Sequence, residues 1–192
     1  MAKLDASFYP KEKIERLRAR FSDSISEVII DGTDVPILIV PKARISAFLE
    51  AIKIEEGFEY NFLADLTAYD FNPPLAGIPD YNLGRMKDEA GAPRFFVVYQ
   101  LLSLQNKDRI RIKVPLKDGE EIPTMTPLWK AANWLEREVW DLYGIRFTDH
   151  PNLKRIMLDE RWQGHPLRKD YPIKKYQRFE DNLEMAAFGI EE

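Results

Sequence analysis

The most strongly predicted element of this chain is a helix over residues 127–143, because the sequence specifies both of its ends. Thr126 is placed to cap the first turn, Pro127 suits the first helical position, and Gly144 suits the left-handed position after the last turn. The apolar side chains cover roughly half of the circumference, which is wider than the ~100° stripe that one packed face requires. The helix therefore either lies inside a large core or packs one stripe on a sheet and offers the remainder to a second contact.

Shorter patterns predict the elements around this helix. Residues 109–116 alternate Arg or Lys with Ile or Val, which is typical of a strand with one exposed and one buried face. Residues 72–93 hold four prolines and three glycines, so we expect a long surface loop there. Apolar spacing predicts further helices, and β-branched or aromatic runs predict further strands, the first two forming a hairpin. The helices are expected over 11–20 and 42–54, and the strands over 26–31, 35–40, 61–71 and 94–104.

Composition excludes several classes of function. The chain has no cysteine, which excludes thiolate-held iron–sulfur clusters, CxxC redox chemistry, Cys-type zinc sites and disulfides. No two of the nine glycines lie closer than seven residues, so the dinucleotide, P-loop and serine-hydrolase glycine motifs are absent. The two histidines lie 15 residues apart and no HExxH occurs, which argues against a histidine metal site. Any redox centre must therefore belong to another chain.

Charge and hydropathy set expectations for partners and location. The 28 basic and 32 acidic residues give a net charge of −4, which argues against nucleic-acid binding. The longest uncharged stretch, residues 95–106, has 12 residues, whereas a bilayer-spanning helix needs roughly 20. The amino terminus lacks the apolar core of a secretion signal and carries acidic residues that a transit peptide avoids. We expect no membrane span and a cytoplasmic or matrix-like compartment.

The carboxy-terminal third differs in character from the rest. Prolines interrupt it, five basic residues lie within 165–178, and five acidic and no basic residues lie within 179–192. A segment of this kind cannot bury a core of its own, so it is either a solvated tail or an extended ligand for another protein. The mixture of rigid proline, planar arginine and tyrosine in GHPLRKDYP is typical of specific contacts and points toward the second possibility.

Three carboxylates on the predicted helix allow a catalytic alternative. Glu136, Glu138 and Asp141 could supply an acid/base pair in a free-standing enzyme, although Arg137 among them indicates ion pairing in a structural network. Glu136 falls inside the apolar arc of the helix. We therefore expect a half-buried carboxylate that needs a cation from elsewhere.

Several strings in the chain resemble one family. Residues 136–147 read ERExWDLYGIxF, residues 150–156 read HPNLKRI and residues 164–171 read GHPLRKDY. LADLTAYDF, FFVVYQLLSL and AANWLERE fit the same pattern upstream. Together they resemble the C subunits (the 30 kDa family) of NADH:quinone oxidoreductase, respiratory complex I. Two features depart from the family pattern: Thr148-Asp149 before His150, and the length of the 72–93 loop.

The resemblance implies a fold and a place in an assembly. The fold would be α+β, a two-layer sandwich of mostly antiparallel sheet with helices on one face, formed by residues 1–147 and followed by an extended C-terminal arm, residues 148–192. The chain would be a non-catalytic, cofactor-free subunit of the peripheral arm of the complex. It would contact mainly the quinone-reducing D subunit, with the B, I and G subunits as further neighbours, on the cytoplasmic side of the inner membrane and without a span of its own.

The complex passes electrons from NADH through FMN and Fe-S clusters in partner subunits to quinone, coupled to proton translocation. The equivalent subunit of a membrane-bound hydrogenase or of a ferredoxin-linked relative stays open as an alternative. We predict no catalytic, cofactor-binding or metal-binding residue in this chain. The residues predicted to contact partners are Trp129, Glu136, Arg137, Glu138, Trp140, Asp141, His150, Arg155, His165, Pro166, Arg168, Lys169, Asp170 and Tyr171.

Overall fold

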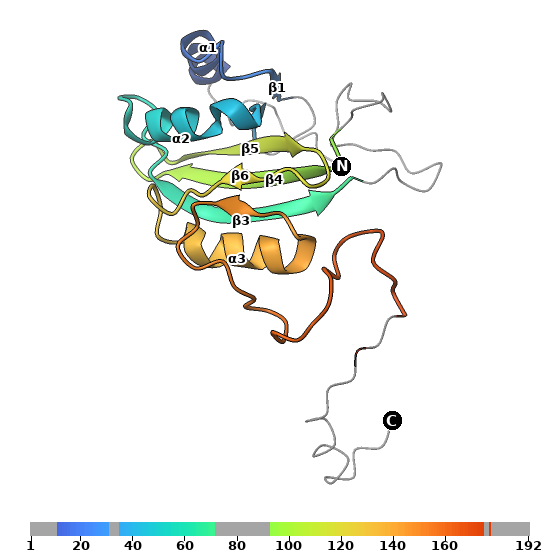
Figure 1. The fold of residues 1–192 in the computed structure, drawn as a ribbon. Helices are drawn as coiled ribbons and strands as arrows, with labels where there is room; N and C mark the ends of the chain where they lie inside the picture. Colours follow the sequence, from blue (N-terminus) through green and yellow to red (C-terminus); the bar gives the residue numbers. More distant parts are fainter. Residues whose placement is uncertain (1–10, 31–34, 72–92, 175–176, 178–192) are drawn as a thin grey trace, which may run out of the picture.

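A five-stranded mixed sheet is the centre of the molecule (Figure 1). The computed structural model describes residues 11–30, 35–71, 93–174 and 177. The strand order is β1-β2-β5-β4-β3; β2 and β5 run parallel, and the other neighbouring pairs are antiparallel. The strands are β1 (Glu27–Ile29), β2 (Ile37–Ile39), β3 (Phe62–Asp70), β4 (Phe95–Ser103) and β5 (Asp108–Leu116).

The long central strands follow from their alternating pattern. In β4, every second side chain, from Phe95 to Leu101, points into one apolar cluster that also holds the buried isoleucines and valine of β5. β4 and β5 pair over nine residues, and β3 pairs with β4 across an irregularity between Leu63 and Asp65. Each of the predicted strands is present, and the antiparallel pairing of β1 with β2 confirms the expected hairpin.

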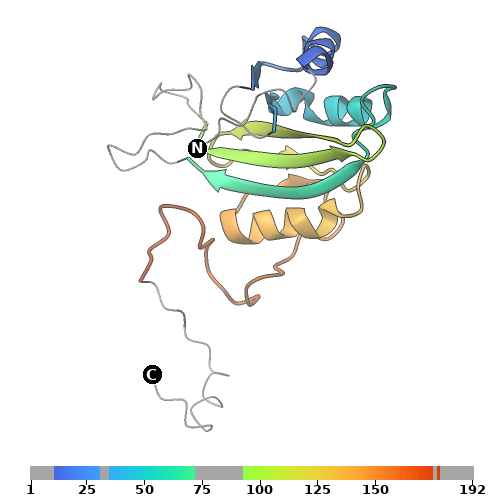
Figure 2. The same cartoon turned by 180° about the vertical axis from the view of Figure 1, so that it is seen from behind.

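Within the described residues, the α-helices contribute to that same apolar cluster, so they cover one face of the sheet. Both views place α2 toward β5 and α3 toward β3 (Figure 1, Figure 2). This confirms the predicted α+β fold with helices on one face. The helical elements are α1 (Lys11–Arg20), the short 3-10 helix η2 (Lys42–Arg44), α2 (Ile45–Ile54) and α3 (Ala132–Tyr143). Among the described residues, none of these helices is long and apolar enough to cross a membrane.

The start predicted for the third helix was wrong. α3 begins at Ala132, and residues 126–131 form turns in which the backbone N–H of Trp129 donates to the Met125 carbonyl oxygen at 2.9 Å. Thr126 does not cap the helix; its hydroxyl group lies 3.1 Å from that of Thr124. The chain before the helix is tied down from two sides, because Glu136 binds residues 124 and 125 and Lys53 donates to the Leu128 carbonyl oxygen at 2.5 Å.

The end of α3 was predicted correctly. Gly144 adopts φ 79°, and its N–H donates to the Trp140 carbonyl oxygen at 2.8 Å. Beyond it, β7 (Phe147–Thr148) pairs in parallel with β6 (Ile122–Pro123), a small second sheet that no sequence pattern indicated. The chain then leaves the core and runs across α3 and onward (Figure 1).

Some predictions fall partly or wholly outside the described residues. These are the hairpin turn at 32–34, most of the 72–93 loop, and the acidic end of the chain. The predicted boundary between residues 147 and 148 falls inside β7 and stays a prediction. We use the name C-terminal arm below for residues 149–174.

Candidate functional site

Asp141 is the main attachment point of the C-terminal arm to α3. Its side chain is fully buried, and one carboxylate oxygen accepts three successive backbone N–H groups from the arm. The other oxygen pairs with the Arg155 guanidinium. Burial opposes ionisation of this carboxyl, but the backbone donors and Arg155 outweigh it and hold the pKa of Asp141 below its usual value. The three N–H donors are Ile156 (2.9 Å), Met157 (2.8 Å) and Leu158 (3.0 Å).

Two arginines extend this attachment by binding backbone carbonyl groups. Arg137 of α3 donates to the carbonyl oxygens of Lys154 and Arg155, both at 3.0 Å. Arg155 itself also donates to the Gly164 carbonyl oxygen at 3.0 Å, and its guanidinium lies 5.8 Å from the centre of the Trp140 ring. The predicted ion pairing of Arg137 with the carboxylates of its helix is not found among the described residues: Arg155 pairs with Asp141, and Arg137 holds the arm through main-chain oxygens.

Both histidines are bound by backbone groups at the ends of α3. His150 places its Nε2 3.0 Å from the Asn133 carbonyl oxygen, and its Nδ1 accepts the Asn152 N–H at 3.0 Å. Burial lowers the pKa of His150; the carbonyl of Asn133 opposes this and the charge of Arg137 adds to it. The Nδ1 of His165 lies 2.8 Å from the Asp141 carbonyl oxygen. These rings fix turns of the arm.

Five charged side chains join the arm to one end of the sheet, and we call them the charge cluster: Arg94, Arg168, Asp70, Asp118 and Asp170. Asp70 ends β3, Arg94 precedes β4 and Asp118 follows β5, so the sheet supplies three of the five. Arg94 pairs with all three carboxylates at 2.6–3.0 Å, and Arg168 pairs with Asp118 at 2.9 Å and Asp170 at 3.1 Å. Both guanidinium groups lie over the Phe95 ring.

The carboxylates of the charge cluster differ in solvent exposure, and this difference determines how strong each ion pair is. The Asp70 side chain is 1% exposed, whereas those of Asp118 and Asp170 are about half exposed. Hydrogen bonds from Arg168 lower the pKa of Asp118, and lower that of Asp170 to about 2. Solvent screening weakens the exposed pairs. The Arg94–Asp70 pair is therefore the strongest ion pair of the charge cluster. Arg168 of the arm is connected to Arg94 through Asp118, which pairs with both.

The last part of the arm is fixed by backbone contacts and close packing. The N–H of Lys169 donates to the Asp70 carboxylate at 2.9 Å. Tyr171 packs against Gly164 so closely that a Cβ there would lie 2.8 Å from its ring, and its hydroxyl group accepts a hydrogen bond from Gln177 at 2.8 Å. Pro166 and Glu138 are half-buried. The arm is therefore held at α3 and at the sheet end.

Glu136 and Trp129 are enclosed by the chain itself. Glu136 is fully buried rather than half-buried, and its donors are the Thr124 hydroxyl and the Met125 N–H, both neutral, so the prediction of a cation was wrong. Trp129 is buried, and its indole N–H donates to the Asn61 carbonyl oxygen at 3.0 Å. Whether these residues contact a partner stays a prediction.

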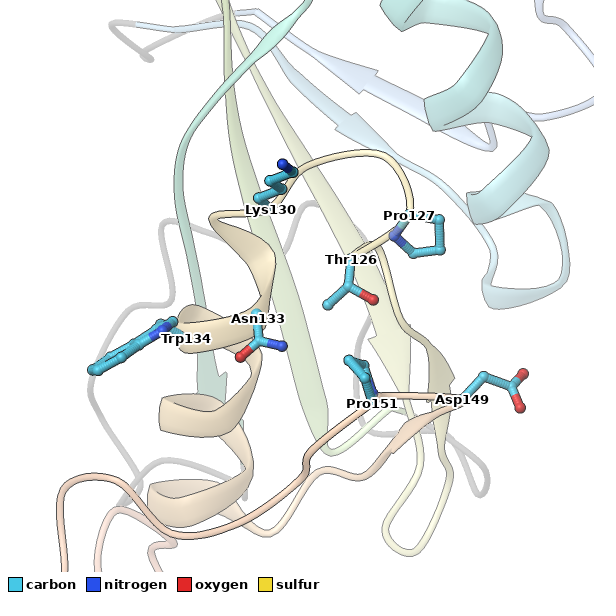
Figure 3. Close-up of a pocket in the computed structure, with 7 residues that line it drawn as sticks. All are labelled: Thr126, Pro127, Lys130, Asn133, Trp134, Asp149 and Pro151. Atoms are coloured by element: carbon cyan, nitrogen blue, oxygen red, sulfur yellow. The ribbon is translucent and has the colours of Figure 1, made fainter.

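An open groove lies where the arm begins, beside the first turn of α3. Figure 3 shows Trp134 and Asn133 on the helix, with Pro151 and Asp149 across from them on the arm. The groove has a volume of about 550 Å³ and contains none of the three carboxylates of the catalytic alternative. Within the part of the chain that the structure describes, no group of three or more His, Cys, Asp or Glu residues could hold a metal ion. The groove is lined by Thr126, Pro127, Lys130, Asn133, Trp134, Asp149 and Pro151.

Four of the seven large apolar side chains that are exposed among the described residues lie on α3 and the arm, and the other three, Ile54, Phe62 and Leu104, lie elsewhere. Trp134 on α3 is 66% exposed, and the arm adds Met157, Leu167 and the fully exposed Ile173. Trp140 is half-buried between Arg155 and His165. Exposed large apolar groups are enriched where proteins meet other proteins. We call this set the α3–arm surface.

Sequence reasoning found the arm side of these contacts and missed most of the core side. Asp70, Arg94 and Asp118 lie 24–99 residues away from their partners along the chain, and no local pattern connects them. Thr124 also gave no signal, because its role depends on where Glu136 points. Asp70 lies one residue before the end of the strand predicted over 61–71, and nothing in that pattern singled it out.

A family model and the sequences of known proteins both match this chain, and they indicate the same family. The family model described as "Respiratory-chain NADH dehydrogenase, 30 Kd subunit" matches residues 38–177. The chain is 46% identical over 160 residues to the C subunit of NADH-quinone oxidoreductase from Geotalea uraniireducens, covering 83% of this chain and 85% of that protein. It is 40% identical over 144 residues to the C/D subunit of the same enzyme from Nitrosospira multiformis, covering 74% of this chain and 22% of that protein.

A solved structure shares the fold. It is a chain of the membrane-bound sulfane sulfur reductase, described as an archaeal respiratory membrane complex, with a TM-score of 0.63. The match covers 85% of this chain and 86% of that chain at 20% sequence identity. At this identity the likeness supports the α+β fold alone.

Proposed function

Because the chain belongs to the family of the 30 kDa subunit of respiratory-chain NADH dehydrogenase, we propose that it is a structural subunit of the peripheral arm of complex I. It would hold the quinone-reducing module in position while other subunits carry out electron transfer. The observation that carries this proposal is the α3–arm surface: a segment without a core of its own lies fixed on the domain and presents large apolar side chains outward.

The residues of this chain indicate which functions of the complex its partner subunits would carry out. A chain without cysteine has no thiolate ligands, so Fe-S clusters would be bound by partner subunits. The family resemblance implies that FMN would be bound by partner subunits as well. Electrons would pass from NADH through those groups to quinone, coupled to proton translocation. The chain would be active only as part of that enzyme.

Among the partners, we propose the D subunit as the principal one, with B, I and G as further neighbours. The Nitrosospira relative carries the combined name C/D, which supports close proximity of the C and D subunits. The complex would be attached on the cytoplasmic side of the inner membrane, and this chain would reach the membrane through its partners.

The hydrogenase or ferredoxin-linked alternative receives less support. Curated relatives at 38–46% identity are named as C subunits of NADH-quinone oxidoreductase. The likeness to the sulfane sulfur reductase chain extends only to the fold. We therefore propose NADH as the electron donor of the complex.

Replacement of Arg168 tests the proposal. Arg168→Ala removes the side chain that links the arm to Asp118 and also pairs with Asp170 within the arm, at a cost of about 1–2 kcal/mol in arm attachment after allowance for exposure. We expect NADH:quinone activity of membranes to fall in proportion to the amount of assembled complex on native gels. Arg161→Ala is the matched control, because Arg161 is an exposed arm residue that pairs with Asp159 two positions away. Fully assembled complex with slowed turnover would contradict the proposal.

A further inference from the structure

The Glu136 carboxylate lies in a closed site between three segments of the chain. It projects from α3, is fully buried, and binds the stretch before α3 through the Thr124 hydroxyl at 2.5 Å and the Met125 N–H at 2.6 Å. On the arm side, the nearest titratable group is His150, whose Nε2 lies 3.9 Å from Oε2 of Glu136. A buried carboxylate with two neutral donors is poorly compensated for the loss of water.

The geometry of this site suits the protonated acid better than the anion. With a proton on Oε2, Glu136 can donate to Thr124, whose hydroxyl can in turn donate to Thr126, 3.1 Å away. Oε1 still accepts the Met125 N–H. Each polar atom then has a partner, and no charge is buried.

His150 does not neutralise the anion in this arrangement. Its Nδ1 accepts the Asn152 N–H and therefore carries no proton, while its Nε2 donates to the Asn133 carbonyl oxygen. A proton added to Nδ1 would break the bond to Asn152. His150 lies 3.9 Å from Glu136 and also accepts the Asn152 N–H, so it connects the protonation of Glu136 to the first turn of the arm.

Other titratable groups around Glu136 supply no compensating charge. Tyr99 of β4 is fully buried, and its hydroxyl group has no hydrogen-bond partner among the described residues. Burial, and then the charge of Glu136, raise the pKa of Tyr99, so it stays neutral. Lys53 of α2 is bound to the Leu128 carbonyl oxygen, and Arg137 is bound to carbonyl oxygens of the arm.

We propose that Glu136 and His150 form a pH-responsive joint, in which loss of the proton of the buried Glu136 carboxyl group loosens the first turn of the arm from α3. A charged Glu136 is relieved by water entering between α3 and residues 149–152. That entry separates His150 from α3 and loosens the turn in which the Asn152 N–H donates to His150.

The direction of the pH effect follows from the burial of Glu136. Burial raises the pKa of Glu136 from 4.5 to about 7, while the bonds from Thr124 and Met125 oppose the rise. Because the closed form binds this proton more tightly than the open form, the joint is firmest below about pH 5 and weakens as the pH rises through 7. The opening constant should increase about tenfold between pH 6 and pH 8.

Hydrogen exchange of the full-length chain tests the joint. The amides of Met125 and Asn152, which donate to the two side chains, should lose about tenfold in protection between pH 6 and pH 8 after correction for intrinsic rates. In Glu136→Gln this pH dependence should disappear, since the amide can accept from Met125 and donate to Thr124. Glu50→Gln, on the exposed side of α2, is the control and should keep it. Equal pH dependence in the wild type and in Glu136→Gln would overturn the proposal.

A second measurement needs no variant. The side-chain carboxyl carbon of Glu136, followed by NMR in the wild-type chain, should titrate with a midpoint near 7. A midpoint near 4.5, the value for an ordinary glutamate, would overturn the proposal. Either outcome concerns the isolated chain and leaves the assembly role to be tested separately.

Discussion

Replacing Asp141 with alanine is expected to lower the free energy of unfolding of this chain by about 3–5 kcal/mol. The change leaves the half-buried Arg155 guanidinium without its carboxylate and three arm N–H groups without an acceptor. Urea unfolding at pH 7, followed by tryptophan fluorescence, measures the effect. Asp159→Ala removes an exposed aspartate of the same arm and should change stability by no more than about 0.5 kcal/mol.

The same substitution should also remove part of the acid sensitivity. The pKa of Asp141 is held below the usual 3.8, so its contribution is complete above that pH and is lost as the pH falls through the folded-state value. The difference between the wild type and Asp141→Ala should therefore shrink in strong acid. A loss below about 1 kcal/mol at pH 7, or a difference that grows in acid, would contradict the assigned role of this carboxylate.

Gly144→Ala should be the second most damaging single change, at about 3 kcal/mol. Its φ of 79° costs a side-chain-bearing residue about 1–2 kcal/mol. In addition, a Cβ would lie 2.7 Å from Cδ2 of His165, so the ring must move and weaken its contact with the Asp141 carbonyl oxygen. Denaturant unfolding gives the total cost.

Gly119 separates the two contributions. Its φ is 78°, but a Cβ there would meet nothing within 4 Å, so Gly119→Ala carries only the backbone cost. The difference between the two variants measures the close approach of the arm to the end of α3. Equal losses in the two variants would mean that His165 is not held against Gly144.

Local patterns predicted the strands, the helix end at Gly144 and the unusual character of the arm. These features depend on short-range rules: period-two alternation, a left-handed glycine, and too few apolar residues to fold alone. The start of α3 could not be found this way, because the bonds of Glu136 and Lys53 to the preceding segment override the capping signal at Thr126.

The arm residues of the candidate site could be predicted from the sequence, whereas contacts that depend on the arrangement of distant elements could not. His150, Arg155, His165 and Arg168 drew attention through residue type and through the family resemblance. The sheet-end partner of Arg168 is set by the arrangement of the sheet, because Asp118 lies 50 residues from Arg168 along the chain. The full burial of Glu136 depended on α3 lying so that this side chain points toward Thr124 and Tyr99 rather than to the helix surface.

The most direct test of the structural role is affinity purification of the full-length chain from membranes of its own source, with NADH:quinone reductase activity measured per mole of chain. We expect the chain to co-purify with a D subunit and iron–sulfur-bearing subunits in fixed proportion, with all of the activity in that assembly and none in the chain freed from it. Recovery of the chain alone, with turnover of its own, would contradict the proposed function.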